Sequence, residues 1–283
     1  MMSILTETYT LNNGINIPQV GFGTWQIPNG DVAYRAVSEA LAAGYRHIDT
    51  ALVYGNEKSV GRAIANSGIP RSELFVTTKL PAQTKDRVGV VDAFNRSLDN
   101  LDMPYVDLYL IHAPWPWSMP GVRYDKQNLV AWDMMQRFYD DHQARAIGVS
   151  NFDDHDLANI IDHGDLKPAV DQIQYYIGAT EPINAGFAQK NDVLVEAYSP
   201  LATGGLLDNA DLRPFADKYG VSIAQLALRF VLQNGVLPLP KATSAAHIQA
   251  NTQLDFEISA DDMAKLNAMP DFSPDGAHNK TQR

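Results

Sequence analysis

The strongest constraint on the fold is a set of short apolar runs that alternate with segments of helical spacing. The apolar runs occupy residues 20–25, 45–49, 74–79, 106–112, 146–151, 169–172, 193–198 and 236–241. Helical spacing occurs between them at 32–43, 59–66, 88–101, 129–142, 157–162 and 223–233. Such alternation is typical of parallel βα units. Eight runs of this kind predict an α/β fold, a (β/α)8 TIM barrel.

Two further elements are expected outside the repeat. Residues 8–11 and 15–17 flank an Asn-Asn-Gly segment at 12–14, where Asn-Gly supplies the positive φ angles of a tight hairpin. We expect this N-terminal β-hairpin to cover the far end of the barrel. Ser259 to Asp262 has the form of a helix-starting box and predicts an extra C-terminal helix. Residues 271–283 hold few apolar side chains and are expected to form a tail near the barrel mouth.

Length and composition restrict the class of protein. The 283 residues fit one barrel, commonly about 250 residues long, so we expect a single domain over 1–283. No apolar run approaches the roughly 18 residues that span a bilayer. A formal charge of −11 opposes binding to nucleic acid or anionic lipid. The chain has no cysteine, and residues 1–7 do not resemble a secretory signal, so we expect a soluble, cytoplasmic monomer that binds neither nucleic acid nor membranes.

Four polar side chains are predicted to meet at the barrel mouth. Asp49 ends the second apolar run, Tyr54 follows in the next loop, and Lys79 and His112 end the third and fourth runs. The carboxyl ends of all the strands of a barrel open on one face. These four residues should therefore surround one point. An ordinary ion pair closing the barrel end is the structural alternative for Asp49 and Lys79.

The four side chains suit proton transfer to oxygen. A phenol loses its proton near pH ~10, and a neighbouring ammonium lowers that pKa, so we expect Lys79 to lower the pKa of Tyr54. Asp49 would keep Lys79 protonated. A neutral His112 could donate a hydrogen bond to a substrate oxygen and orient it. Such a proton donor fits a carbonyl that becomes an alcohol as a hydride arrives at carbon.

The sequence has no Rossmann-type binding site for a dinucleotide that could donate the hydride. Residues 21–26 read Gly-Phe-Gly-Thr-Trp-Gln, which breaks the dinucleotide-binding glycine pattern at its last position. A dinucleotide would have to lie across the barrel mouth. The histidines at 47, 142, 155, 163 and 278 show no metal-binding spacing, so no metal is expected.

Several motifs resemble one known family. Residues 44–51 read Gly-Tyr-Arg-His-Ile-Asp-Thr-Ala and are followed by Tyr54, Asn56-Glu57 and Gly61. Leu-Ile-His at 110–112, Gly-Val-Ser-Asn-Phe at 148–152, Ala-Tyr-Ser-Pro-Leu at 197–201 and Pro-Lys at 240–241 follow in order. From the hairpin to about Asn251 the chain resembles the aldo-keto reductase superfamily, and in particular bacterial members that reduce small dicarbonyls, keto-sugars and aldehydes.

The resemblance implies roles for the residues around the mouth. It makes Tyr54 the proton donor, tuned by Lys79 and Asp49, and His112 the group that orients the carbonyl. It implies an NADPH cofactor and a small carbonyl substrate bounded by Trp25 and Trp115 beside Tyr54 and His112. The implied cofactor contacts are Thr24, Asp49, Ser150, Asn151, Gln172, Tyr198, Ser199, Leu201, Lys241, Thr243, His247 and Asn251, with Tyr198 stacked on the nicotinamide and Lys241 beside the 2′-phosphate.

Four positions depart from the family pattern. Ala242, His247 and Ala250 stand where the family usually has Ser, Arg and Glu. A histidine offers less fixed charge than arginine and no bidentate fork, so we expect NADPH to be preferred only modestly and NADH to be usable. Ala113 follows His112 where many relatives carry Trp, and Trp115 and Trp117 come shortly after. These tryptophans are either pocket walls or loop anchors.

Two other functions compete with carbonyl reduction. The barrel could be a nicotinamide-sensing binding protein that has no significant turnover. It could also be an aldolase that uses Lys79 to form a Schiff base. The pairing with Asp49 argues against the aldolase, because a lysine that stays charged is a poor nucleophile.

Overall fold

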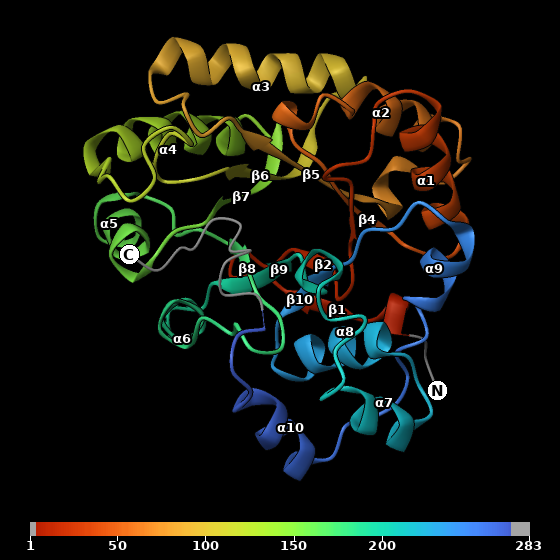
Figure 1. Cartoon of the computed structure of the whole chain (residues 1–283). Coiled ribbons are helices and arrows are strands. Elements are labelled where there is room, and N and C mark those ends of the chain that lie inside the picture. The colour runs from red at the N-terminus through yellow and green to blue at the C-terminus, as the bar shows by residue number, and fades with distance from the viewer. Residues whose placement is uncertain (1–3, 273–283) are drawn as a thin grey trace.

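The eight apolar runs form a barrel of parallel strands, as the alternation predicts. The computed structural model describes residues 4–272, and Figure 1 looks along the barrel. The strands are β3 (Phe22–Gly23), β4 (His47–Asp49), β5 (Phe75–Leu80), β6 (Val106–Ile111), β7 (Ala144–Ser150), β8 (Val170–Gln174), β9 (Leu194–Tyr198) and β10 (Leu237–Leu239), paired in chain order. Hydrogen bonds from Gly21 N to Pro238 O (3.1 Å) and from Gly23 N to Pro240 O (3.0 Å) join the two outer strands and close the barrel.

Helices surround the strands (Figure 1). They are α1 (Asp31–Ala42), α2 (Glu57–Ala65), α3 (Arg87–Leu101), α4 (Asp125–Asp140), α5 (Asp154–His163), α6 (Pro182–Lys190), α7 (Arg213–Tyr219), α8 (Ile223–Gln233), α9 (Ala245–Ala250) and α10 (Ala260–Asn267). The six segments of helical spacing overlap α1 to α5 and α8, with ends that differ by a few residues. Across 4–272, no helix has both the length and the apolar character to cross a membrane.

The N-terminal hairpin covers the far end of the barrel, as expected. Strands β1 (Thr8–Thr10) and β2 (Asn16–Pro18) pair in antiparallel fashion. Asn12 Nδ2 donates to the carbonyls of Pro168 and Asp192, just before β8 and β9. The expectation of positive φ at both turn residues is wrong in part: Gly14 has φ +83°, whereas Asn13 does not enter the left-handed region. The 12–14 turn therefore needs glycine at one position only.

The extra C-terminal helix is present as α10. Ser259 caps it by accepting a hydrogen bond from Asp262 N. The Asp262 carboxylate does not return to Ser259 but binds Lys218 and Tyr219, so the helix start is confirmed without the reciprocal half of the box. Most of the expected tail at 271–283 lies outside the described residues.

The barrel interior is apolar at the end covered by the hairpin and polar toward the mouth. Leu108, Leu110 and Val170 fill the end covered by Leu11 and Ile17 of the hairpin region. Above them lies a buried polar layer formed by His47, Asp49, Thr77, Lys79, Gln172 and Glu196. Side chains two residues apart on a strand point to the same face, so Gln172 lies on the mouth side of Val170 on β8.

Candidate active site

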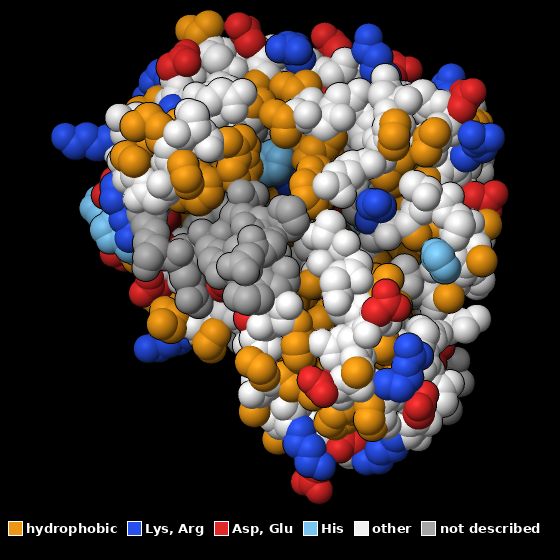
Figure 2. Space-filling view, viewed as in Figure 1, with side chains coloured by type: hydrophobic (Ala, Val, Ile, Leu, Met, Phe, Trp, Pro, Cys, Tyr) orange, Lys and Arg blue, Asp and Glu red, His pale blue; other side chains and the backbone are white. Residues whose placement is uncertain are grey.

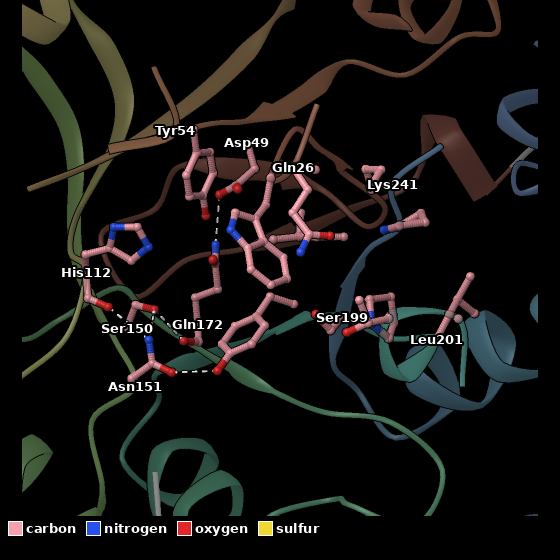
Figure 3. A pocket seen from close by; sticks show the side chains of 18 of the residues that line it. Gln26, Asp49, Tyr54, His112, Ser150, Asn151, Gln172, Ser199, Leu201 and Lys241 are labelled. Atoms are coloured by element: carbon pink, nitrogen blue, oxygen red, sulfur yellow. Dashed lines mark hydrogen bonds between the residues drawn. The ribbon is translucent and has the colours of Figure 1, made fainter. Parts of the chain in front are cut away.

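A cavity of about 580 Å³ opens at the carboxyl ends of the strands, within the size range of ligand sites. Figure 3 shows Tyr54 and His112 at one end of it and Leu201 and Lys241 at the other. Eleven expected site residues line the cavity: Trp25, Asp49, Tyr54, His112, Ser150, Asn151, Gln172, Tyr198, Ser199, Leu201 and Lys241. In Figure 2, hydrophobic side chains border the hollow of this face, while charged side chains of both signs are scattered over the periphery.

Lys79 is completely buried beneath the cavity and fully hydrogen-bonded. Its ammonium donates to Asp49 Oδ1 and Oδ2, both at 2.7 Å, and to Thr50 O at 2.9 Å. An ammonium has three donors, so none remains for a ligand. The pair is formed as the sequence predicted, from adjacent strands β4 and β5.

Tyr54 projects into the cavity from the short 3-10 turn Leu52–Tyr54. The Lys79 Nζ lies 5.2 Å from the centre of its ring. Burial raises the pKa of the Tyr54 phenol well above 10, and the Asp49 carboxylate raises it further. The expectation that Lys79 lowers this pKa is therefore wrong, because the phenol is desolvated and Asp49 offsets the ammonium charge. The Tyr54 hydroxyl holds its proton at neutral pH.

His112 stands beside Tyr54 as a neutral ring. The two ring centres are 5.6 Å apart in an edge-to-face arrangement. Burial first, and then the Lys79 charge, lower the pKa of His112 well below 6.5, which agrees with the expected neutral imidazole. Its Nδ1 is buried with no hydrogen-bond partner among residues 4–272.

A chain of polar side chains forms the wall opposite Tyr54. Ser150 Oγ donates to Gln172 O at 2.8 Å, and Asn151 Nδ2 donates to His112 O at 2.9 Å. Tyr198 Oη donates to Asn151 Oδ1 at 2.7 Å. The carboxyl ends of β6, β7, β8 and β9 are thereby connected to one another. Figure 3 shows the Gln172 amide reaching toward Asp49.

Several non-glycine residues with left-handed backbone conformation lie around the cavity. Gln26, Asn151, Ser199 and Thr203 all line it and have φ between +49° and +61°. Such conformations cost of order 1–3 kcal/mol each and cluster at ligand sites, where the surrounding structure enforces them. The backbone strain therefore independently indicates a binding site here.

The remaining expected cofactor contacts lie away from the cavity wall. Thr24 is buried and its hydroxyl donates to Asp49 O at 2.9 Å. Thr243 and His247 are exposed and follow Lys241 closely in the sequence, and Asn251 is the buried residue directly after α9. Lys241 is also exposed, so the far end of the cavity opens to solvent near one cation.

The aromatic wall is built differently from the expectation. Trp25 lines the cavity with 36 % of its surface exposed, whereas Trp115 is 2 % exposed and does not line it. Trp117 lines the cavity instead, with its ring centre 5.6 Å from that of His112. Trp115 packs edge-on behind Trp117 at 5.3 Å. The sequence did not distinguish a pocket wall from a loop anchor for either tryptophan. The path of the loop after β6 makes Trp117 the pocket wall and Trp115 the buried anchor behind it.

Some lining residues and one buried carboxyl were not expected from the sequence. Gln26, Val53 and Leu207 line the cavity but carry no motif. Glu196 lies fully buried under the mouth and touches Gln172. Its position two residues before Tyr198 on one strand was a usable signal, because alternate residues share a face.

Comparison with known proteins identifies the family. The model of the Aldo/keto reductase family matches residues 19–271. The chain belongs to this family. It is 38% identical over 270 residues to the glyoxal reductase of Bacillus subtilis (strain 168), with 95% of each chain covered.

Solved structures agree with this assignment. A crystal structure of an aldo/keto reductase from Brucella melitensis superposes with a TM-score of 0.86 at 39% identity, covering 92% of this chain and 98% of that one. A Bombyx mori aldo-keto reductase in complex with NADP gives a TM-score of 0.84 at 34% identity, covering 92% of each chain. The protein is thus an NAD(P)-dependent oxidoreductase with an (β/α)8 barrel, and its family reduces carbonyl groups.

Proposed function

We propose that this aldo-keto reductase uses NADPH to reduce small aldehydes, ketones, dicarbonyls or keto-sugars, with Tyr54 as the proton donor. The observation that carries the proposal is the convergence of the Tyr54 phenol, the His112 ring and the Ser150, Asn151 and Gln172 polar wall on one cavity. When bound, the nicotinamide supplies the hydride. The rest of the chemistry falls to side chains of this chain.

Tyr54 supplies the proton. Its raised pKa keeps the phenol protonated at neutral pH, which is the state a general acid needs, and an alkoxide is basic enough to take that proton. Lys79 lies close enough to the ring to stabilise the phenolate left behind. Asp49 keeps Lys79 in place through two hydrogen bonds.

His112 orients the substrate oxygen. As a neutral ring it can donate one hydrogen bond, and its place beside Tyr54 directs donor groups from both residues to the same oxygen. Trp25 and Trp117 give this end of the cavity apolar walls. Those walls limit the water that could compete for the proton.

The residues of the cavity fit a nicotinamide dinucleotide. Ser150, Asn151 and Gln172 offer polar groups for a carboxamide, and the ring of Tyr198 lines the same wall. Ser199 and Leu201 lie toward the open end, where exposed Lys241 is placed for a phosphate. The His247 position lacks a fixed charge, so NADPH is preferred modestly and NADH is usable.

The geometry argues against a Schiff-base aldolase. The Lys79 ammonium has all three donors engaged, is fully buried and does not line the cavity. Attack on a carbonyl requires a neutral amine that reaches the substrate. Lys79 meets neither condition in this arrangement.

Replacement of Tyr54 by phenylalanine tests the proposal. Turnover of methylglyoxal with NADPH should fall by roughly 100- to 10,000-fold, the range for loss of a general acid. The Kd for NADPH, measured by quenching of protein fluorescence, should change little. Tyr45→Phe is the matched control, because Tyr45 is buried away from the cavity and its hydroxyl has no hydrogen-bond partner in the described chain; its activity should equal the wild type.

Two results would overturn the proposal. Undiminished turnover in Tyr54→Phe would remove Tyr54 as the acid. Tight NADPH binding by the wild type with no turnover on a broad panel of carbonyl compounds would favour a nicotinamide sensor instead.

A further inference from the structure

A second carboxyl lies beneath the cavity, one layer below Tyr198. Glu196 is on β9 two residues before Tyr198, so both side chains point into the barrel. Its side chain is completely buried. Its Oε2 accepts a hydrogen bond from Gln172 Nε2 at 2.8 Å.

Among residues 4–272, Glu196 forms no close ion pair that would explain its burial. Its Oε1 has no hydrogen-bond partner within residues 4–272, and the nearest basic nitrogen, His47 Nε2, is 4.0 Å away. That ring stays neutral, because burial and the Lys79 charge lower the pKa of His47 to about 3. Burying a carboxyl without such compensation is costly. The hydrogen bond to Gln172 is therefore the contact that indicates the role of Glu196.

Gln172 is held from two sides by acceptors. Its Nε2 donates to Glu196 Oε2 and, at 2.9 Å, to Asp49 Oδ2. A side-chain amide has two N–H donors on nitrogen and an acceptor oxygen. Both donors are engaged, so the plane of the amide is fixed, and flipping it would set its oxygen against the Asp49 carboxylate. No described residue donates to Gln172 Oε1, and Gln172 lines the cavity.

We propose that Glu196 is a positioning residue that, together with Asp49, locks the Gln172 amide so that its oxygen acts as an acceptor for the NH2 of the nicotinamide carboxamide. The inference rests on the proposed use of a nicotinamide cofactor. Asp49 alone engages only one amide hydrogen and leaves the amide able to rotate about that bond. Glu196 removes this freedom, and its side chain reaches the cofactor only through Gln172.

Binding of a cofactor analogue tests the proposal without turnover. The 3-acetylpyridine analogue of NADP⁺ carries a methyl group where NADP⁺ has the carboxamide NH2. The Kd of each is measured by titration calorimetry for the wild type, Glu196→Leu, Glu196→Gln and Gln172→Leu. Loss of one hydrogen bond should make the analogue bind the wild type roughly 3- to 10-fold more weakly than NADP⁺.

The variants separate positioning from general stability. Glu196→Gln keeps an oxygen that can accept from Gln172 Nε2 and should keep the wild-type ratio of the two Kd values. Glu196→Leu should loosen the Gln172 acceptor oxygen, and Gln172→Leu removes it. Both variants should therefore bring the ratio of the two Kd values to within about 2-fold of unity. If Glu196→Leu does not fold, Glu196→Met takes its place.

Each outcome decides one claim. An undiminished ratio in the apolar Glu196 variants overturns the positioning role. A wild type that binds NADP⁺ and its analogue equally well removes the carboxamide contact, and the inference with it. A wild type that binds no NADP⁺ at all contradicts the proposed function itself.

Discussion

Replacement of Glu196 by glutamine should change how the stability of the protein depends on pH. Burial, and then the nearby Asp49 charge, raise the pKa of Glu196 from 4.5 to about 8. In the unfolded chain this group titrates near its ordinary value. Between these two pKa values the folded state holds a proton that the unfolded state has lost, so the contribution of Glu196 to stability falls as the pH rises from about 4.5 to about 8.

The size of the effect follows from the interval over which the two states differ. One pH unit of unequal protonation corresponds to about 1.4 kcal/mol, and about two units separate pH 6 from the folded-state pKa of about 8. Relative to Glu196→Gln, the wild type should lose about 2–3 kcal/mol of unfolding free energy between pH 6 and pH 8.5. His47 does not interfere, because its lowered pKa of about 3 places its own unequal protonation between about 3 and 6.5.

Urea unfolding of both proteins across this pH range measures the difference directly. Lys85, whose pKa burial lowers to about 7, also titrates here, but it is present in both proteins and cancels in the comparison. Glu39→Gln removes an exposed carboxyl on α1 and serves as the matched control with a curve parallel to the wild type. Parallel curves for Glu196→Gln and the wild type would show that the pKa of Glu196 does not differ between the folded and unfolded states.

Three further substitutions probe the site. His247→Arg adds a fixed charge and a bidentate fork beside the expected 2′-phosphate position, and should raise the ratio of kcat/KM for NADPH to that for NADH roughly 10-fold; an unchanged ratio would place the phosphate elsewhere. Trp117→Ala removes a cavity wall against His112 and should raise KM for aromatic aldehydes several-fold with a smaller change for methylglyoxal, whereas equal changes for both substrates would argue against a wall. Asp49→Asn leaves the Lys79 ammonium buried without its carboxylate and should lower the unfolding free energy, measured by urea denaturation, by about 3–5 kcal/mol. A loss under about 1 kcal/mol would show that Thr50 O and water are enough to compensate the buried ammonium.

The sequence predicted the barrel well because its signals are local. Seven of the eight apolar runs end at a residue that lines the cavity, as with Asp49 and Gln172, and the run 74–79 ends at Lys79 directly beneath it. Parallel strands share one carboxyl edge, so the position of a residue at a strand end is enough to place it. The N-terminal hairpin and α10 followed from turn and capping residues in the same way.

The errors concern properties that depend on the surroundings of a residue. The direction of the Tyr54 pKa shift depends on how much water the fold removes and on Asp49 as well as on Lys79, which sequence positions do not quantify. The choice between Trp115 and Trp117 depends on the path of the loop after β6. The role of Glu196 was not expected, because the sequence of β9 alone does not show which residue of a neighbouring strand its carboxyl contacts.

A crystal structure of the protein with NADP⁺ and a small carbonyl-containing inhibitor would show whether Tyr54 and His112 bind the reacting oxygen. The inhibitor oxygen should lie within about 2.6–3.2 Å of both the Tyr54 hydroxyl and a His112 ring nitrogen, above a Lys79 still bound to Asp49. An inhibitor oxygen bound away from Tyr54, with the phenol turned from the nicotinamide, would contradict the role of Tyr54 as proton donor.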